Sequence, residues 1–124
     1  MEKAKLEAEY GLYINGQWRP AANGDTYTAE SPADGSHLAV CAQATREDVD
    51  DAVKAAWEAF KTWKKTTPAQ RAALLNKIAD IIDANKEHLG MVESMDNGKP
   101  IRETMNVDIP LSAAHFRYFA GCIL

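Results

Sequence analysis

The amino-acid sequence changes its periodicity abruptly at Thr45, and this change limits the folds open to the chain. Before Thr45, short β-prone runs alternate with glycine-containing turns, and after it apolar residues recur at three- and four-residue steps. The first pattern is typical of short strands and the second of amphipathic helices. We therefore expect an α+β chain in which an N-terminal β-hairpin and short strands are followed by three or four helices.

The region before Thr45 contains the turn sequence Asn15-Gly16 between two β-prone runs. Asn and Gly adopt positive φ at low cost, so this pair predicts a tight hairpin. A Pro- and Gly-containing turn at 31–35 separates two further runs. Strands as short as these are not a stable sheet by themselves. The predicted strands are 12–14, 17–18, 26–28 and 37–42.

The region from Thr45 onward contains recognisable helix starts and stops. Thr45, with Asp48 three residues later, predicts one N-cap, and Thr67 followed by Pro68 predicts another. We expect Gly90 to interrupt the second helix. The third and fourth helices are then predicted at 91–96, ended by Asn97-Gly98, and at about 101–120, with a kink or restart at Pro110.

Large apolar side chains gather on one face of the first predicted helix. Val49, Val53, Phe60 and Trp63 are spaced for one helical face, and Trp57 adds a third aromatic ring nearby. A ligand-stacking platform is one interpretation of these rings. Packing in a helical core is the alternative that we favour.

The composition excludes several classes of function. The net charge is −4 and no Lys or Arg cluster is present, which argues against a nucleic-acid partner. No apolar run approaches the roughly 20 residues that span a bilayer, so we predict no membrane association and a cytoplasmic location. Cys41 and Cys122 lie far apart in a chain without a secretory signal, so we expect reduced thiols.

Asp108, His115 and Cys122 together contain the residue types of a catalytic triad. On a helix, their seven-residue spacing separates neighbours by roughly 10 Å along the axis, whereas a nucleophile and its base need contact at about 3 Å. We therefore expect no triad here. The histidines also lack the spacing of metal ligands.

Several segments of the chain, in this order, resemble the N-terminal region of the aldehyde dehydrogenase superfamily. The resemblance extends over about residues 12–123. The segments are Tyr13-Ile14-Asn15-Gly16-Gln17-Trp18, Ser31-Pro32-Ala33-Asp34-Gly35, the helical patterns at 48–63 and 71–80, Asp96-Asn97-Gly98-Lys99-Pro100, and Arg117-Tyr118-Phe119-Ala120-Gly121.

The resemblance implies an enzyme that oxidises aldehydes with NAD or NADP, through a cysteine nucleophile, a glutamate base and an α/β architecture with a Rossmann-like cofactor domain. By resemblance, these catalytic and cofactor-binding residues lie beyond Leu124. The chain has no Gly-x-Gly-x-x-Gly motif. We therefore expect it to be an N-terminal fragment, about the first quarter of the enzyme, inactive alone and without a cofactor of its own. Residues 1–44 would form the hairpin and strands, and residues 45–124 the helical part of the cofactor-binding domain.

The resemblance also implies two lesser sites. A monovalent cation would be held by the carboxylate of Asp96 and by backbone carbonyls near Ala29 and Glu30. Leu111 would line the substrate tunnel. The alternatives are that Asp96 caps or orients a turn and that Leu111 is ordinary core.

The implied partners are a small-molecule aldehyde and further copies of the same subunit. A second hypothesis is a truncated, non-catalytic product that associates with full-length subunits. A third, a free-standing helical binding domain, leaves the order of the matching segments unexplained.

Overall fold

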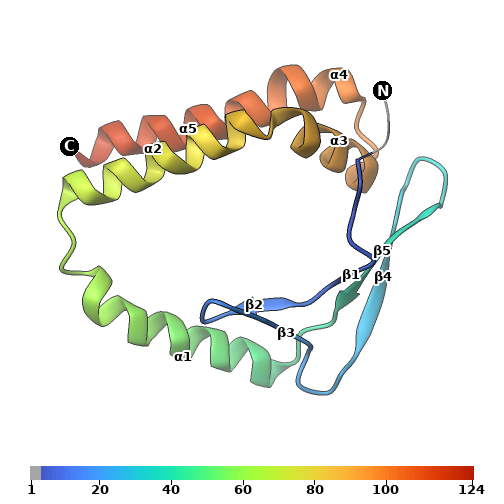
Figure 1. Cartoon of the computed structure of the whole chain (residues 1–124), viewed down its shortest axis with the longest axis horizontal. Coiled ribbons are helices and arrows are strands. Elements are labelled where there is room, and N and C mark those ends of the chain that lie inside the picture. The colour runs from blue at the N-terminus through green and yellow to red at the C-terminus, as the bar shows by residue number, and fades with distance from the viewer. Residues whose placement is uncertain (1–3) are drawn as a thin grey trace. The chain divides into compact units, whose positions relative to one another are not determined.

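The structure is a computed structural model that describes residues 4–124 (Figure 1). The chain divides into two compact units, one made of residues 5–65 and one of residues 66–124 together with Ala4. The strands are β1 (Glu9–Tyr10), β2 (Leu12–Ile14), β3 (Gln17–Arg19), β4 (Thr26–Glu30) and β5 (His37–Ala42). The helices are α1 (Arg46–Trp63), α2 (Pro68–Ala84), α3 (Lys86–Asn97), α4 (Ile101–Glu103) and α5 (Ile109–Ile123), with a π-helical turn, η1 (Thr104–Asp108), between the last two. This order of short strands and then helices confirms the α+β prediction.

Strands β2 and β3 form the predicted antiparallel hairpin. Its turn residues Asn15 and Gly16 have φ of 53° and 77°, the left-handed conformation that these two residue types tolerate best. Tyr13 and Trp18 face each other across the hairpin, with ring centroids 5.0 Å apart. The turn chemistry and this cross-strand aromatic pair together fix the hairpin register.

The remaining strands form a three-stranded sheet in the order β1-β5-β4. Strands β4 and β5 are antiparallel and match the predicted runs, whereas β1 was not predicted. This two-residue strand pairs in parallel with β5, through partners distant in sequence, and therefore leaves no local pattern. The register of β4 and β5 shifts between Ala29 and Glu30, which pair with Ala39 and His37.

Two capping boxes define the starts of α1 and α2. The Thr45 hydroxyl accepts a hydrogen bond from the Asp48 amide, and the Asp48 carboxylate accepts one from the Thr45 amide. Thr67 and Gln70 make the same reciprocal pair ahead of Pro68. Both predicted helix starts are confirmed, because each capping residue satisfies amides that the first helical turn leaves unpaired.

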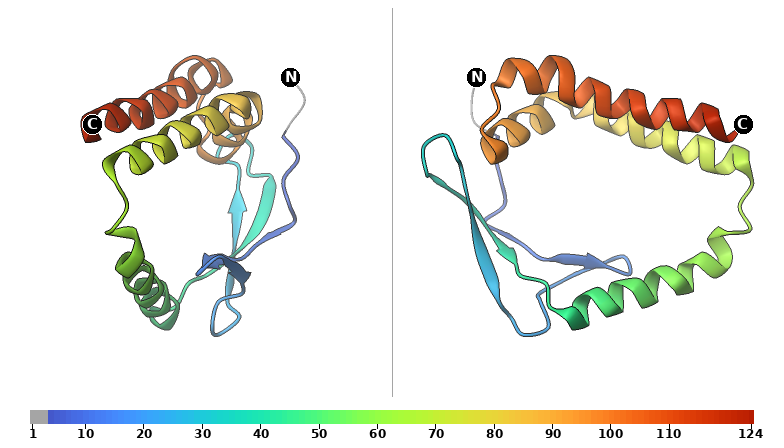
Figure 2. Two further views of the ribbon diagram at one scale, coloured as in Figure 1. Left: turned by 60° about the vertical axis from the view of Figure 1, so that its left-hand side comes forward. Right: turned by 180° about the vertical axis from the view of Figure 1, so that it is seen from behind.

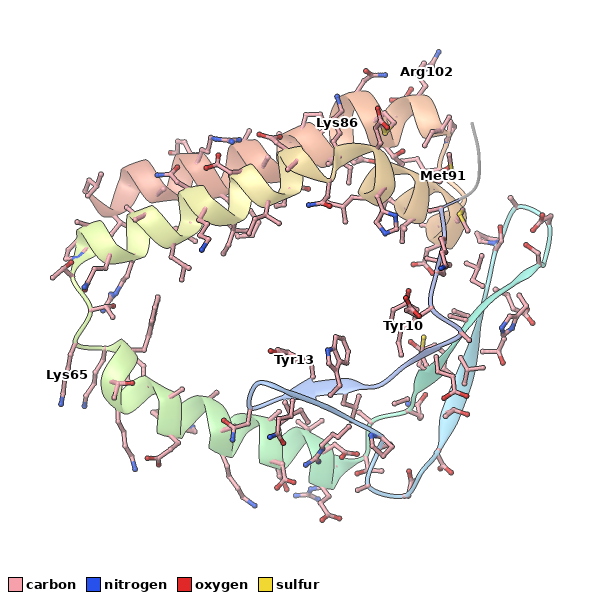
Figure 3. All side chains as sticks on the ribbon, in the orientation of Figure 1. Tyr10, Tyr13, Lys65, Lys86, Met91 and Arg102 are labelled. Carbon is pink, nitrogen blue, oxygen red and sulfur yellow. The ribbon has the colours of Figure 1, made fainter. Side chains whose placement is uncertain are left out.

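The prediction that Gly90 interrupts a helix is wrong. The break falls at Asn85, and Gly90 is buried within α3. A β-carbon at position 90 would collide with the Met105 side chain and lie 3.5 Å from the Thr104 hydroxyl oxygen. Gly90 is therefore a close-packing residue of α3, not a breaker. The end of α3 is as expected, with Gly98 at a φ of 79°. Lys86 and Met91 lie on α3, and Arg102 lies on α4 (Figure 3).

The restart predicted at Pro110 takes the form of the π turn η1, followed by α5 with Pro110 in its first turn. Proline has no amide hydrogen to donate and its ring crowds the preceding helical turn. Irregular turns of this kind are a common accommodation of such a residue.

Helices α2 and α5 form the packed interior of the unit 66–124. They run side by side and antiparallel, as both views of Figure 2 show. Small side chains at the contact let the two backbones approach closely. The buried residues of this contact are Ala72, Ala79, Ala113 and Ala120. Arg117 adds ion pairs from α5 to Asp80 at 2.7 Å and Asp83 at 2.8 Å.

The prediction that the aromatic face of α1 packs in a core is wrong for the chain as described. Trp57, Phe60 and Trp63 are 66%, 45% and 43% exposed, and Val49 and Val53 are half exposed. Trp57 and Phe60 contact each other edge to face, with centroids 6.0 Å apart. These side chains are largely exposed, so the periodicity marks an apolar surface of the unit 5–65.

Candidate functional site

The predicted cation ligands fall in both units of the chain. Ala29 and Glu30 are the last two residues of β4 in the unit 5–65, and Asp96 is exposed near the end of α3 in the other unit. The cation site therefore stays a prediction. Within residues 4–124, no three side chains of His, Cys, Asp or Glu gather as metal ligands.

The backbone at Ala29 and Glu30 is irregular. Ala29 pairs with Ala39 and the next residue, Glu30, pairs with His37. Leu38 of β5 therefore has no partner residue in β4 and is an extra residue between the two pairs. A bulge of this kind disrupts the regular hydrogen bonding of the strands. The end of β4 is thus a place where backbone carbonyl groups can serve other partners.

The side-chain contacts of the turn near Asp96 are made by its neighbour Asn97. The Asn97 side chain accepts a hydrogen bond from the Lys99 amide at 2.9 Å, and its amide group donates to Glu93 at 2.6 Å. Asn97 thus supplies the local capping that was the alternative role for Asp96.

Leu111 is half exposed, so the alternative that it is ordinary core is wrong for this chain. It lies on α5, seven residues before Tyr118 of the same helix and four residues after Val107 of η1, and these two side chains are 67% and 47% exposed. The buried alanines of α5 belong to the face that meets α2. Leu111 therefore belongs to an exposed apolar stripe on this helix, as a residue that contacts a ligand or another protein segment would.

The three residues of the supposed triad have other partners or lie apart along a helix. The Asp108 carboxylate pairs with the Lys99 ammonium at 2.7 Å. His115 and Cys122 lie on the continuous helix α5, about 10 Å apart along its axis. Cys41 and Cys122 are both free thiols.

The most highly connected side chain of the unit 5–65 is Asp48, which sequence reasoning assigned only to a helix cap. It is 1% exposed. Its carboxylate accepts hydrogen bonds from the Thr45 amide and hydroxyl, from the Ala22 amide at 3.1 Å, and from the Arg19 guanidinium at 2.6 Å. Arg19 also pairs with Asp51 at 3.2 Å. This polar network joins β3 and the following turn to the first turn of α1.

The network holds the Asp48 carboxylate in its charged form. The backbone hydrogen bond from Thr45, and then that from Ala22, lower the pKa of Asp48 far below its usual range, with Arg19 contributing further. The hydrogen bond to Asp48 in turn raises the pKa of Arg19. All acceptor positions of Asp48 serve these donors, so the cluster stabilises the fold and is not a catalytic group. Two of its donors, Arg19 and Ala22, are distant in sequence, so the network leaves no local motif.

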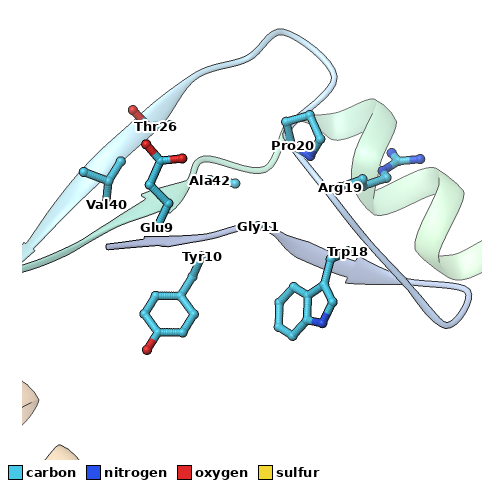
Figure 4. A pocket seen from close by; sticks show the side chains of 9 residues that line it. All are labelled: Glu9, Tyr10, Gly11, Trp18, Arg19, Pro20, Thr26, Val40 and Ala42. Atoms are coloured by element: carbon cyan, nitrogen blue, oxygen red, sulfur yellow. The ribbon is translucent and has the colours of Figure 1, made fainter. Parts of the chain in front are cut away.

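A cavity of about 350 Å³ lies beside this network, between β1, β3 and the sheet (Figure 4). Tyr10 and Trp18 project to one side of the β1–β2 segment and Glu9 to the other. Arg19 is already paired with Asp48. The Arg19 guanidinium is therefore not free to bind an anion in this cavity.

The glycines of residues 4–124 do not form the loop that is typical of a dinucleotide site. Gly16, Gly24, Gly35 and Gly98 occupy turns at positive φ, and no glycine-rich loop joins a strand to a helix start among residues 4–124. Binding of a pyrophosphate needs such backbone amides at a helix N-terminus. No helix of residues 4–124 is long and apolar enough to cross a membrane.

Comparisons with known proteins agree with the motifs. The family model described as "Aldehyde dehydrogenase family" matches residues 18–124. An acetaldehyde dehydrogenase of Pseudomonas aeruginosa is 48% identical over 118 residues, which is 95% of this chain and 23% of that protein. A long-chain-aldehyde dehydrogenase of an Acinetobacter species is 45% identical over 98% of this chain and 24% of its own length.

Solved structures give the same result for the fold. The crystal structure of PnpE in complex with nicotinamide adenine dinucleotide matches with a TM-score of 0.88 and 44% identity, over 90% of this chain and 23% of that one. Indole-3-acetaldehyde dehydrogenase complexed with NAD+ matches with a TM-score of 0.91 and 35% identity, over 95% of this chain and 24% of that one. The chain thus spans about a quarter of the length of the relatives that it matches. Its sequence, its motifs and its fold place it in the aldehyde dehydrogenase family, as the N-terminal portion of the superfamily architecture.

Proposed function

We propose that this chain acts as the N-terminal segment of an NAD(P)-dependent aldehyde dehydrogenase, which oxidises a small aldehyde to the acid. The observation that carries the proposal is the match of residues 18–124 to the family model, together with relatives that are named for acetaldehyde and long-chain aldehydes. The nucleophile, the base and the cofactor loop are supplied by sequence outside these 124 residues. The chain alone is inactive and binds no NAD or NADP.

Within that enzyme, residues 45–124 form the helical part of the cofactor-binding domain and residues 1–44 form the hairpin and strands that accompany it. The polar network of Asp48 fixes α1 to the hairpin, and the α2–α5 contact provides a rigid base. The chain's contribution is therefore a scaffold that orients neighbouring segments.

Asp96, with backbone carbonyls near Ala29 and Glu30, contributes ligands to a monovalent cation site. Carboxylate and carbonyl oxygens suit a hard cation. The strand irregularity at Ala29 and Glu30 supports this assignment, because regular ladder hydrogen bonding is interrupted there. In the complete enzyme, Asp96→Asn is expected to weaken activation by K⁺, with Asp50→Asn as an exposed control.

Leu111 lines the substrate passage. Its exposure on the stripe of α5 that faces away from α2 supports this role. An aliphatic side chain there favours an apolar aldehyde.

The enzyme is a cytoplasmic homo-oligomer that uses neither nucleic acid nor a membrane as a partner. An alternative is a truncated, non-catalytic product that associates with full-length subunits. The exposed rings of Tyr13 and Trp18 favour this alternative, since they are 62% and 67% exposed on the hairpin. Co-elution with a full-length relative, and a change in its activity, would support it.

A chimera tests the main proposal. Residues 1–124 are joined to the part of the Pseudomonas aeruginosa relative that follows the matched region, and NADH formation is measured with acetaldehyde. We expect the chimera to be active and the 124-residue chain to be inactive. NADH formation by the short chain, lost in its Cys122→Ser variant, would overturn the proposal. A chimera that folds and binds NAD without oxidising any aldehyde would contradict it as well.

A further inference from the structure

The π turn between α4 and α5 is attached at one end to α3 and at the other to the turn that follows α3. Its first residue, Thr104, is fully buried, and the Thr104 hydroxyl donates to the Gly90 carbonyl of α3 at 2.7 Å. Its last residue, Asp108, pairs with Lys99 at 2.7 Å. A π turn is rare and less favourable than a regular turn, so it persists where tertiary contacts support it.

Lys99 is itself held in place by its backbone. Its amide donates to the Asn97 side chain at 2.9 Å, and its carbonyl accepts a hydrogen bond from the Ser94 hydroxyl at 2.6 Å. These bonds fix the turn that follows α3, so the Lys99 ammonium reaches Asp108 from a defined position. The hydrogen bond to Asp108 also raises the pKa of Lys99. Lys99 therefore stays charged at neutral pH.

The π turn determines how the residues before α5 are oriented relative to those on α5. One extra residue in a helix rotates the following positions by about 100°. The face of α5 that carries Ala113 and Ala120 is fixed against α2. Val107, inside the π turn, and Leu111, on α5, are both about half exposed. Loss of the π turn would rotate Val107 relative to Leu111.

We propose that Lys99 and Asp108 form a positioning pair, which holds the π turn in the conformation that presents its apolar stripe to the aldehyde. This inference rests on the proposed function, because it assumes that Leu111 lines the substrate passage. The side chains of Lys99 and Asp108 are 41% and 27% exposed, and ion pairs with this exposure add little to stability. The contribution of the pair is to geometry, so its removal should change substrate use without unfolding the chain.

The experiment uses the active chimera and four versions of it: Lys99→Met, Asp108→Asn, the exchanged pair Lys99→Asp with Asp108→Lys, and Arg102→Gln. Arg102 forms an exposed ion pair with Glu103 at 2.9 Å and serves as the matched control. The KM and kcat values for acetaldehyde and hexanal are measured. In each single variant, we expect the ratio of the hexanal KM to the acetaldehyde KM to rise about fivefold, with kcat for acetaldehyde unchanged. In the exchanged pair, the KM ratio should return most of the way to its original value. Arg102→Gln should leave the KM ratio unaltered.

A second measurement, on the 124-residue chain, tests directly how stably the π turn is formed. Amide hydrogen exchange at 104–112 should become about tenfold faster in the single variants and return toward the original rate in the exchanged pair. An unaltered KM ratio in an active chimera, or unaltered exchange at these amides, would overturn the positioning role. An inactive chimera with the original Lys99 and Asp108 would instead count against the proposed function, so the two failures are distinct.

Discussion

The two units of the chain are stabilised by different kinds of contact. In residues 66–124, α2 and α5 bury alanines from both helices. In residues 5–65, the buried apolar side chains are Ala21 and Ala39, and the largest fully buried side chain is the carboxylate of Asp48. The unit 66–124 thus has a packed interior, whereas the unit 5–65 depends on a polar network.

The two units also differ in their tryptophan residues. All three tryptophans of the chain lie in the unit 5–65, and each is at least 43% exposed. Exposed apolar surface of this extent is typical of a face that contacts other protein. A polar network fixes geometry well but adds less stability than apolar burial of similar volume. We therefore expect the unit 5–65 to be the less stable part of the isolated chain.

Asp48→Asn should destabilise the unit 5–65, and we expect its effect to be the largest of the variants. The amide that replaces one carboxylate oxygen cannot accept from all of the Asp48 donors, and it leaves Arg19 without its closest anion. We expect the melting temperature of the unit 5–65 to fall by about 10 °C. Tryptophan fluorescence reports this unit alone, because no tryptophan lies outside it. Asp50→Asn, at an exposed position of the same helix, is the control. Equal melting temperatures for the two variants would contradict the role of the network.

Acid should weaken the same unit. The hydrogen bonds to Asp48 lower its folded-state pKa, so the stability that they confer is complete above the unfolded pKa of about 4. This stability is lost as the pH falls from about 4 toward the folded pKa. We expect a change in tryptophan fluorescence below pH 4 that Asp48→Asn does not show. The same acid transition in both proteins would show that other groups control it.

Gly90→Ala tests the packing of the unit 66–124. The added methyl group would meet Met105 and Thr104, and overpacking of this kind costs about 2 kcal/mol. Gly121→Ala is the matched variant, because a β-carbon at this helical position meets nothing within 4 Å. That variant should stabilise the chain by about 0.5 kcal/mol, since alanine favours a helix. Urea unfolding followed by circular dichroism measures both changes. Equal effects of the two variants would show that α3 does not pack closely on η1.

Thr67→Ala should have a smaller effect than Gly90→Ala. It removes the hydroxyl that accepts from the Gln70 amide at the start of α2, which costs about 1 kcal/mol. Ser112→Ala removes only a hydroxyl that donates to the Asp108 carbonyl within a helix, and should change stability by less than about 0.5 kcal/mol. A larger loss in Ser112→Ala than in Thr67→Ala would contradict the capping argument.

The sequence predicted the features that depend on neighbouring residues. Asn15-Gly16 specified the hairpin, and Thr45 and Thr67 specified the helix starts, because turns and caps are formed by residues within a few positions of each other. The family motifs were recognisable for the same reason. The site residues Asp96, Ala29, Glu30 and Leu111 came from resemblance and stay predictions.

The features that the sequence did not predict depend on partners far along the chain. Gly90 packs closely against Thr104 and Met105, which lie 14 and 15 positions later in the chain. The periodicity around Gly90 does not reveal this contact. Arg19 reaches Asp48 across 29 positions, and β1 pairs with β5. The face of α1 was interpreted as core because an amphipathic pattern is the same whether the chain itself or another segment covers it.

Hydrogen exchange along the intact 124-residue chain tests the central claim most directly. If the unit 66–124 has its own packed interior and the unit 5–65 depends on a polar network, the amides of α2 and α5 should be the most protected. Amides in the middle of α1 should exchange about a hundredfold faster, since an isolated helix of this length is marginal in water. Protection of α1 equal to or greater than that of α2 and α5 would contradict this account.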